Sequence, residues 1–280
     1  MKVLLAGCGY VASELGLRLV SLGAEVWALR RSAAGLPSAF HAVSADLAIP
    51  GQLDQLPRGL EYVVYSASAG ESSDAAYERA YVRGLSNLIA ALAGQPLRRI
   101  FFTSSTSVYA QADGSWVDEA SETSPAHFSG QRTLEAERVL ETSGLPATVL
   151  RCAGIYGPGR AHLIEAVRTG TANTSERYVN RIHRDDLAGA ILHLMTHDVA
   201  EPRLILSDDE PAPQRDIARF LARALGVPEP ADAASPGRGG HKRCRNDRLK
   251  ATGYALQYPT YREGYAALLR AADPGTPSAD

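Results

Sequence analysis

The hydrophobic pattern of the first half of the chain alternates between short apolar runs and longer segments with helical spacing. Residues 2–6 (KVLLA) form an apolar run of the length expected for a strand buried on both faces. The segment that follows carries Leu15, Leu19 and Leu22 at the spacing of one helical stripe. Residues 25–29 are the next predicted strand. The chain therefore opens with a strand, a turn, a helix and a second strand.

The same alternation continues to about residue 150. Further strands are predicted at residues 42–45, 60–66, 99–103 and 147–150. Long helices are predicted over residues 74–94, with Asp74 as the N-cap, and within residues 123–143 after Pro125. Strands that alternate with helices are typical of an α/β fold with a doubly wound parallel sheet of Rossmann type.

The pattern becomes fragmentary after Gly157. An amphipathic helix is clear at residues 184–195, and residues 229–240 are rich in Pro, Gly and Ala, as in a surface loop. Shorter elements are predicted at residues 161–168, 204–207, 215–225, 246–252 and 261–271. We therefore predict a Rossmann domain over residues 1–156, a small mixed C-terminal lobe over residues 157–270 and a frayed tail over residues 271–280.

The turn after the first strand reads GCGYVA at residues 7–12, a G-x-G-x-x-A pattern, with Gly16 four residues further on. In this pattern Gly7 permits a tight turn, and Gly9 lets the backbone approach a pyrophosphate. Ala12 and Gly16 let the helix pack closely on the sheet, so that its N-terminal amides point at the phosphates. We therefore predict a dinucleotide site that contains Gly7, Gly9, Tyr10, Val11 and Ala12.

The end of the second strand indicates which dinucleotide is bound. A site that prefers NAD(H) carries Asp or Glu there to bind the ribose hydroxyls. This chain instead carries Arg30, Arg31 and Ser32, and guanidinium groups bind phosphate through a fork of donors. The sequence therefore favours NADP(H) over NAD(H), although solvation alone would equally account for Arg31.

Composition excludes several classes of protein. Of the 280 residues, 45% are hydrophobic and 21% are charged, and the net charge of −2 argues against nucleic acid or an anionic membrane as the partner. No apolar run approaches the roughly 20 residues of a membrane span. Cys8, Cys152 and Cys244 fit no zinc spacing, so we expect reduced thiols in a cytoplasmic protein. We expect no metal site, because Asp185 and Asp186 beside His183 suit a helix start better.

Several stretches together resemble the extended and atypical short-chain dehydrogenase/reductase superfamily, in particular its NAD-dependent epimerase/dehydratase relatives. The likeness extends from Gly7 to about Leu269, and LKATGYALQYPTYREGY at residues 249–265 resembles the family's closing segment. Five further stretches occur in the family order. They are GCGYVA at residues 7–12, Asp46-Leu47, FFTSSTSVYA at residues 101–110, RCAGIYGPGR at residues 151–160 and RIHRDDLAGAI at residues 181–191. The resemblance implies that Ser105 is the catalytic serine. It also implies that Asp46 and Leu47 lie beside the adenine, that Ser66, Ala67 and Ser68 line the ribose and pyrophosphate, and that Ala153, Gly154 and Ile155 lie against the nicotinamide.

The family's Tyr-x-x-x-Lys motif is missing from this chain. Phe128 stands at the tyrosine position and Arg132 at the lysine position, and Tyr81 takes a place where relatives often carry Asn. Phenylalanine cannot be a general acid, whereas Arg132 could still hold the ribose hydroxyls. Tyr109, Tyr156 and His127 are nearby candidates for the missing proton donor, each more often found in packing or at the surface.

Two hypotheses of function remain open. In the first, the chain is an NADP(H)-binding oxidoreductase or epimerase-like enzyme with a non-standard site, in which Ser105 polarises a carbonyl of an unknown small-molecule substrate and Arg132 positions the ribose. In the second, it is a catalytically inactive dinucleotide-binding sensor or scaffold, which the Phe128 and Arg132 replacements favour. By analogy with the family, a homodimer would pair through residues 74–94 and 133–143.

Overall fold

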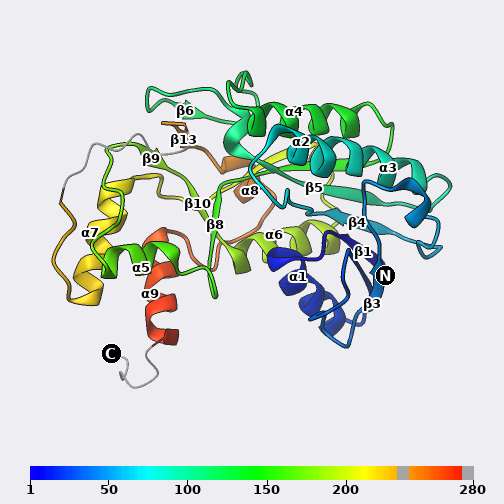
Figure 1. Ribbon diagram of the computed structural model, residues 1–280, viewed down its shortest axis with the longest axis horizontal. Helices are drawn as coiled ribbons and strands as arrows, with labels where there is room; N and C mark the ends of the chain where they lie inside the picture. Colours follow the sequence, from blue (N-terminus) through cyan, green and yellow to red (C-terminus); the bar gives the residue numbers. More distant parts are fainter. Residues whose placement is uncertain (232–239, 273–280) are drawn as a thin grey trace.

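The computed structural model describes residues 1–231 and 240–272, and its centre is a seven-stranded parallel sheet (Figure 1). In spatial order the strands are β11 (Arg203–Leu206), β7 (Ala147–Cys152), β5 (Arg99–Ser105), β4 (Tyr62–Tyr65), β1 (Lys2–Ala6), β2 (Glu25–Arg30) and β3 (His41–Ser44). The strand order reverses between β1 and β4, so a crevice opens at their carboxyl ends. The predicted Rossmann-type sheet is confirmed.

Helices cover both faces of the sheet. Alternate residues of each strand face opposite layers, so Val3 and Leu5 join one core while Leu4 and Ala6 join the other. The first core lies under α1 (Tyr10–Ser21) and α6 (Arg184–Thr196). The second lies under α2 (Asp74–Tyr77), the π-helical segment η2 (Glu78–Arg83), α3 (Gly84–Ala91) and α4 (Phe128–Glu141). Two 3₁₀ turns, η1 (Pro50–Gln52) and η3 (Thr106–Val108), follow β3 and β5.

The long helix predicted over residues 74–94 has a different internal structure. Its N-cap is Ser73 rather than Asp74, because Ser73 has extended backbone and its Oγ accepts the amide of Ala76 at 3.2 Å. The middle of the helix, Glu78–Arg83, has π-helical rather than α-helical hydrogen bonding. Hydrophobic periodicity cannot show this local widening, because it records only which face is apolar.

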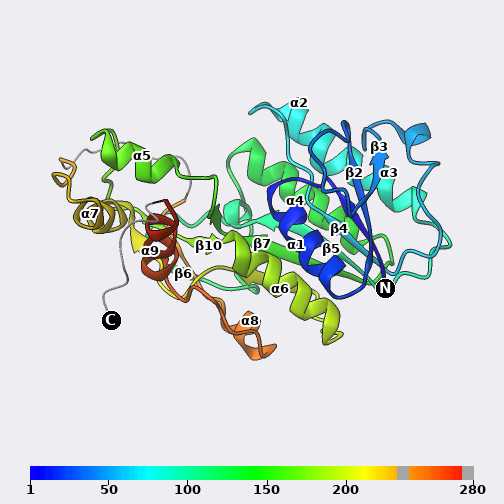
Figure 2. The same cartoon turned by 90° about the horizontal axis from the view of Figure 1, so that it is seen from below.

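A smaller lobe lies at one end of the molecule (Figures 1 and 2). Its helices α5 (His162–Arg168), α7 (Gln214–Leu225) and α9 (Tyr261–Ala272) enclose a separate core. Short paired strands connect the lobe to the sheet. They are β8 (Gly154–Tyr156) with β10 (Arg181–His183), β9 (Tyr178–Val179) with β12 (Ala212–Pro213), and β6 (Trp116–Val117) with β13 (Arg243–Cys244).

The predicted division at residue 157 does not separate the lobe from the sheet. After that point β11 returns to pair with β7, α6 packs on α1, and α8 (Asp247–Ala251) packs on β11. The physical reason is that β7 would otherwise be an open edge of the sheet. Helix α9 continues to Ala272, two residues into the predicted tail. Residues 232–239 of the predicted loop and the rest of the tail, 273–280, lie outside the described residues.

Candidate cofactor and active site

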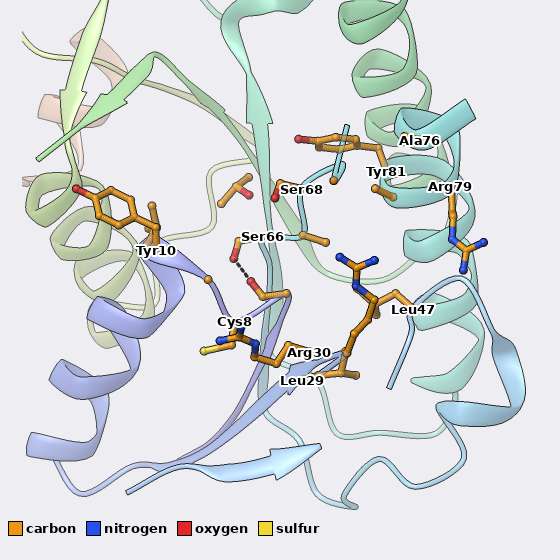
Figure 3. Close-up of a pocket in the computed structure, with 18 of the residues that line it drawn as sticks. Cys8, Tyr10, Leu29, Arg30, Leu47, Ser66, Ser68, Ala76, Arg79 and Tyr81 are labelled. Atoms are coloured by element: carbon orange, nitrogen blue, oxygen red, sulfur yellow. Dashed lines mark hydrogen bonds between the residues drawn. The ribbon is translucent and has the colours of Figure 1, made fainter. Parts of the chain in front are cut away.

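A cavity of about 980 Å³ opens at the crevice above β1 and β4 (Figure 3). Most of the residues predicted to bind cofactor or substrate line it. They are Gly7, Gly9, Tyr10, Val11, Arg30, Arg31, Ser32, Asp46, Leu47, Ser66, Ala67, Ser68, Ser105, Ala153 and Ile155. Three predicted residues, Ala12, Gly154 and Arg132, do not line it.

The glycine turn has the geometry of a pyrophosphate site. Gly7 has a φ of +85°, and a Cβ there would lie 2.4 Å from the backbone of Ala67. Ser66 fixes the turn by donating from Oγ to the carbonyl oxygen of Gly7 at 3.0 Å. Gly9 precedes α1 without any side-chain cap, so the first amides of the helix remain available to an anion. The turn therefore fits a dinucleotide.

Ala12 and Gly16 act through packing behind this turn. Ala12 is fully buried, and a Cβ on Gly16 would lie 2.4 Å from the Phe40 ring and 2.9 Å from Leu5. Their small size lets α1 lie close to the sheet, which is how these positions support the site without lining the cavity.

Three arginines surround the part of the cavity at the end of β2. Arg30 ends β2 and Arg31 follows it, and within the described residues neither forms an ion pair with a carboxylate. Arg79, which no local motif marks in the sequence, reaches the cavity from η2 and pairs with Asp46 at 2.7 Å. Burial opposes ionisation of Asp46, but the Ala48 amide and Arg79 hold the pKa of its carboxyl below the ordinary value. Arg31 also contributes to lowering this pKa. The three guanidinium groups outnumber the Asp46 carboxylate and leave this end of the cavity with net positive charge.

Ser105 reaches the cavity because β5 is two residues longer than predicted. Its Oγ accepts the amide of Ser107 at 3.1 Å, which leaves the hydroxyl proton free to donate into the cavity. Ser104, its neighbour, also borders the cavity, but its hydroxyl donates to the buried carboxylate of Glu137. The hydrogen bond from Ser104 to Glu137 thus holds the end of β5 in place, while Ser105 faces the cavity.

Arg132 is engaged away from the cavity. Its guanidinium binds both carboxylate oxygens of Asp74, each at 2.8 Å, and reaches Glu135 at 2.8 Å. Phe128 likewise does not line the cavity, and its ring contacts Tyr77 edge-on at a centroid distance of 5.4 Å. A role of Arg132 in holding the ribose remains a prediction, and it would require the side chain to leave both carboxylates.

The three proton-donor candidates named from the sequence also lie elsewhere. Tyr109 is buried beneath the sheet end, where its hydroxyl contacts Asp118 and Arg151, each at 2.8 Å. His127 is an exposed N-cap of α4 and accepts the amide of Ser129. Tyr156 lines a different cavity. Tyr81 from η2 does line the cofactor cavity, and burial, the principal cause, raises its pKa to about 12.

A second cavity of about 460 Å³ lies between the sheet and the lobe. It shares Ile155 and Arg160 with the first cavity, so the two spaces adjoin. The remaining lining residues are Tyr156, His162, Leu163, Arg181 and Tyr265. Several buried polar atoms in this region have no hydrogen-bond partner within the described chain, namely Tyr156 Oη, Arg181 Nε, His183 Nε2 and Asp208 Oδ2. This is the polarity expected of a ligand site.

The described part of the chain holds neither a cluster of metal ligands nor a helix able to span a membrane. Across residues 1–231 and 240–272, no three His, Cys, Asp or Glu side chains gather as metal ligands. His183 and Asp186 have structural partners instead, since His183 Nδ1 accepts the Asp185 amide and Asp186 accepts the amides of Gln257 and Tyr258. No helix in the same two ranges is long and apolar enough to cross a membrane.

Known proteins resemble this chain in sequence. The family described as NAD(P)H-binding matches residues 7–198. Protein YeeZ of Escherichia coli strain K12 is 33% identical over 183 residues, which span 64% of this chain and 65% of that protein. The chain thus aligns with slightly less than two thirds of that relative. The 2-alkyl-3-oxoalkanoate reductase of Stenotrophomonas maltophilia strain K279a is 28% identical over 264 residues, or 84% of this chain and 79% of that protein.

Solved structures extend the likeness to the whole chain. A protein from Methylobacillus flagellatus assigned to the NAD-dependent epimerases/dehydratases is 41% identical, with a TM-score of 0.83 over 97% of this chain and 98% of that chain. The Bordetella bronchiseptica enzyme WbmG, solved with NAD, gives a TM-score of 0.86 over 98% of this chain and 94% of that chain at 18% identity, a likeness of fold alone. The chain therefore belongs to the NAD(P)H-binding family and to the epimerase/dehydratase-like proteins of the short-chain dehydrogenase/reductase superfamily.

Proposed function

We propose that the protein is an NADP(H)-dependent oxidoreductase that reduces a carbonyl compound. The preference for NADP(H) is carried by one observation: Arg30, Arg31 and Ser32 line the cavity at the end of β2, where an NAD-specific site carries a carboxylate. Neither guanidinium is engaged by a carboxylate of the described chain. A 2′-phosphate would bring the missing negative charge and accept several N–H donors from each arginine.

The second cavity is the proposed place of the substrate. Its neighbour, the turn that contains Arg160, packs on the glycine turn: the Arg160 guanidinium lies 4.1 Å from the Tyr10 ring centroid, and Tyr10 donates to Pro158 at 2.8 Å. Arg160 and Arg181 give this cavity positive charge, while Leu163 and Tyr265 give it apolar surface. A small carbonyl compound with an anionic group matches this lining.

Ser105 then has a defined task. NADPH held by the glycine turn and the arginines would supply hydride for the carbonyl carbon, so negative charge would develop on the carbonyl oxygen. The free hydroxyl proton of Ser105 can donate a hydrogen bond to that oxygen from the end of β5. Its orientation is fixed from below by the Ser104–Glu137 contact.

Direct binding measurements test the cofactor assignment. We expect NADPH to bind more tightly than NADH when each is titrated by fluorescence. Removing an engaged guanidinium in Arg30→Ala or Arg31→Ala should weaken NADPH binding about 10- to 100-fold, since a hydrogen bond to a charged group contributes about 1.5–3 kcal/mol. NADH binding should change little. Arg168→Ala, which removes an exposed arginine far from the cavity lining, serves as the control.

Tighter binding of NADH, or equal losses for both cofactors in the arginine variants, would contradict the 2′-phosphate assignment. Turnover is tested separately by NADPH oxidation with a panel of carboxylate-bearing ketones and aldehydes. Tight NADPH binding without turnover of any member would instead support the sensor or scaffold hypothesis, which the placement of Phe128 and Arg132 outside the cavity lining favours.

A further inference from the structure

We propose that Tyr81 supplies the proton that Phe128, at the family's tyrosine position, cannot supply. The inference rests on the proposed carbonyl reduction and names the acid for it. Tyr81 lines the cavity from η2, between α2 and α3, whereas Phe128 begins the neighbouring helix α4 and does not line the cavity. Figure 3 shows the Tyr81 ring reaching from this helical wall into the cavity, on the side where Ser68 lies.

The π-helical segment is what places Tyr81 there. A π-helical turn widens the helix and changes the direction of the side chains it carries. Here the preceding carbonyl, that of Ala80, accepts the hydroxyl of Tyr65, which is fully buried on β4. Gly84 makes room for this contact, because a Cβ at that position would lie 2.5 Å from the Tyr65 hydroxyl. The segment is therefore held in its widened form from the sheet side.

Tyr81 also has the properties required of a donor. Within the described chain its Oη has no hydrogen-bond partner, whereas Tyr10, the other phenol lining this cavity, donates to Pro158. Cys152 on β7 lies close enough to contribute, after burial and Tyr77, to the raised pKa of the Tyr81 hydroxyl. Cys152 is the register partner of Ser105, so Tyr81 is directed toward the end of β5 that carries the serine.

The ring of Tyr77 lies between Tyr81 and Phe128, the residue at the position of the family's tyrosine. The Tyr77 ring stacks on Tyr81 at a centroid distance of 5.3 Å and meets Phe128 edge-on at 5.4 Å. Tyr77 does not line the cavity. Phe128 therefore packs against Tyr77, which in turn packs against Tyr81. A side chain without a hydroxyl suits this packing role.

The proposed step balances without further reactants. The hydride from NADPH forms the new C–H bond, and the carbonyl π electrons move to the oxygen. That oxygen takes the proton from Tyr81 Oη, which breaks the phenolic O–H bond and leaves a phenolate. Water entering through the cavity mouth restores the proton. The cofactor is oxidised, the carbonyl is reduced to an alcohol, and Ser105 holds the reacting oxygen throughout.

The surroundings of Tyr81 keep it protonated until this step. The titratable groups that face it are Tyr77 on the same helix, Tyr65 on β4 and Cys152 on β7. Arg132 on the adjacent α4 is paired with Asp74 and Glu135. No cation of the described chain is among the groups that act on it, so the phenol is protonated at neutral pH and able to donate. The cationic nicotinamide of NADP⁺ would be the new positive charge beside it and would lower its pKa.

An ultraviolet titration of tyrosinate tests the placement without any substrate. In saturating NADP⁺ we expect one tyrosine of the wild-type protein to ionise at lower pH than in saturating NADPH. The difference should vanish in Tyr81→Phe and persist in Tyr77→Phe, which removes a hydroxyl from the stacked ring outside the cavity lining. No difference in the wild type, or an undiminished one in Tyr81→Phe, would overturn the proposal.

Kinetics then test the chemical role with a carbonyl compound that the wild type reduces. Tyr81→Phe should lower kcat about 10²- to 10⁴-fold, the usual contribution of general acid catalysis, with little change in KM or in NADPH affinity. Tyr77→Phe should keep kcat within a few-fold. An unchanged kcat in Tyr81→Phe would refute the role. If no carbonyl compound is reduced, the proposed function fails, while the titration still decides whether Tyr81 faces the nicotinamide.

Discussion

At the scale of single residues, the end of β5 rests on one buried ion pair. Arg151 and Glu137 are 2% and 1% exposed, and their bidentate contact has N–O distances of 2.7 and 3.1 Å. Tyr109 and Ser104 complete the network from opposite sides. The Glu137 carboxylate thus accepts hydrogen bonds both from the buried guanidinium and from the serine next to Ser105.

Replacing this carboxylate should be costly. In Glu137→Gln the charge of Arg151 stays buried without its counter-ion, and we expect the free energy of unfolding to fall by about 3–5 kcal/mol. Urea unfolding followed by circular dichroism measures the loss. Glu165→Gln, which breaks an exposed helical pair with Arg168, should cost less than about 1 kcal/mol. Similar losses in the two variants would show that the buried pair does not stabilise the fold in this way.

The sequence predicts site residues well where a local motif fixes both the backbone and its neighbours. The glycine turn is such a case, because Gly7 and Gly9 perform their task through backbone conformation that the chain itself encodes. Arg79 and Tyr81 could not be assigned in this way, since a π-helical turn decides where their side chains point. For Arg132 the resemblance gave a role, but the contacts with Asp74 depend on the packing of α2 against α4.

At the scale of secondary-structure elements, α4 lies unusually close to the turn that follows Ser105. Gly130 in the first part of α4 makes this possible, because a Cβ there would lie 2.4 Å from the carbonyl oxygen of Ser107 and 2.6 Å from Pro125. The Ser107 carbonyl belongs to the main chain, so it cannot move away without moving the rest of the turn. Helix propensity and packing therefore make opposite demands at this glycine.

Gly130→Ala separates these two demands. Propensity alone would stabilise the helix by about 1 kcal/mol. We expect net destabilisation of about 1–3 kcal/mol instead, because the new methyl group overpacks the contact with η3. Urea unfolding measures the sign directly. Gln131→Ala, on the exposed side of the same helix, should be neutral or slightly stabilising. Stabilisation by Gly130→Ala would mean that α4 can shift freely.

Elements with strong local patterns were predictable, and those that depend on distant partners were not. The strands of the main sheet and helices α1, α6 and α7 follow from apolar runs and periodicity close to their observed bounds. The pairing of β6 with β13 joins residues 116–117 to residues 243–244. Two-residue strands carry no periodic signal, so nothing in their own sequence could predict this pairing.

At the scale of the whole molecule, the sheet and the lobe meet over a layer of buried ionisable groups. Asp208 follows β11 and is 1% exposed, and burial raises the pKa of its carboxyl to about 8. His183 ends β10 and is 2% exposed, and burial lowers its pKa to about 4. Burial thus favours the neutral form of both groups at the junction and outweighs the charged neighbours, Asp185 beside His183 and Arg181 beside Asp208.

These shifts predict opposite effects of pH on stability. His183 is neutral in the fold. Its contribution to the free energy of unfolding is therefore fully present above its unfolded pKa of about 6.5, and it is lost as the pH falls toward 4. Asp208 is protonated in the fold. Its contribution to the free energy of unfolding is therefore fully present below its unfolded pKa of about 3.9, and it is lost progressively as the pH rises from there through 8. The two effects therefore offset one another between about pH 4 and pH 6.5, and from about pH 6.5 to pH 8 only the loss from Asp208 remains, so the junction should weaken on the alkaline side.

The isosteric variant Asp208→Asn isolates the alkaline loss, because its amide cannot ionise. We expect the stability of the variant relative to the wild type to increase from pH 5 to pH 8, at a slope of up to about 1.4 kcal/mol per pH unit. Urea unfolding at each pH gives this difference, and the contribution of His183 cancels from it. Asp209→Asn, at the exposed neighbouring position, should show a much flatter difference. A flat difference for Asp208→Asn as well would mean that the Asp208 carboxyl ionises in the fold near its ordinary pKa, with water or Arg181 offsetting its burial.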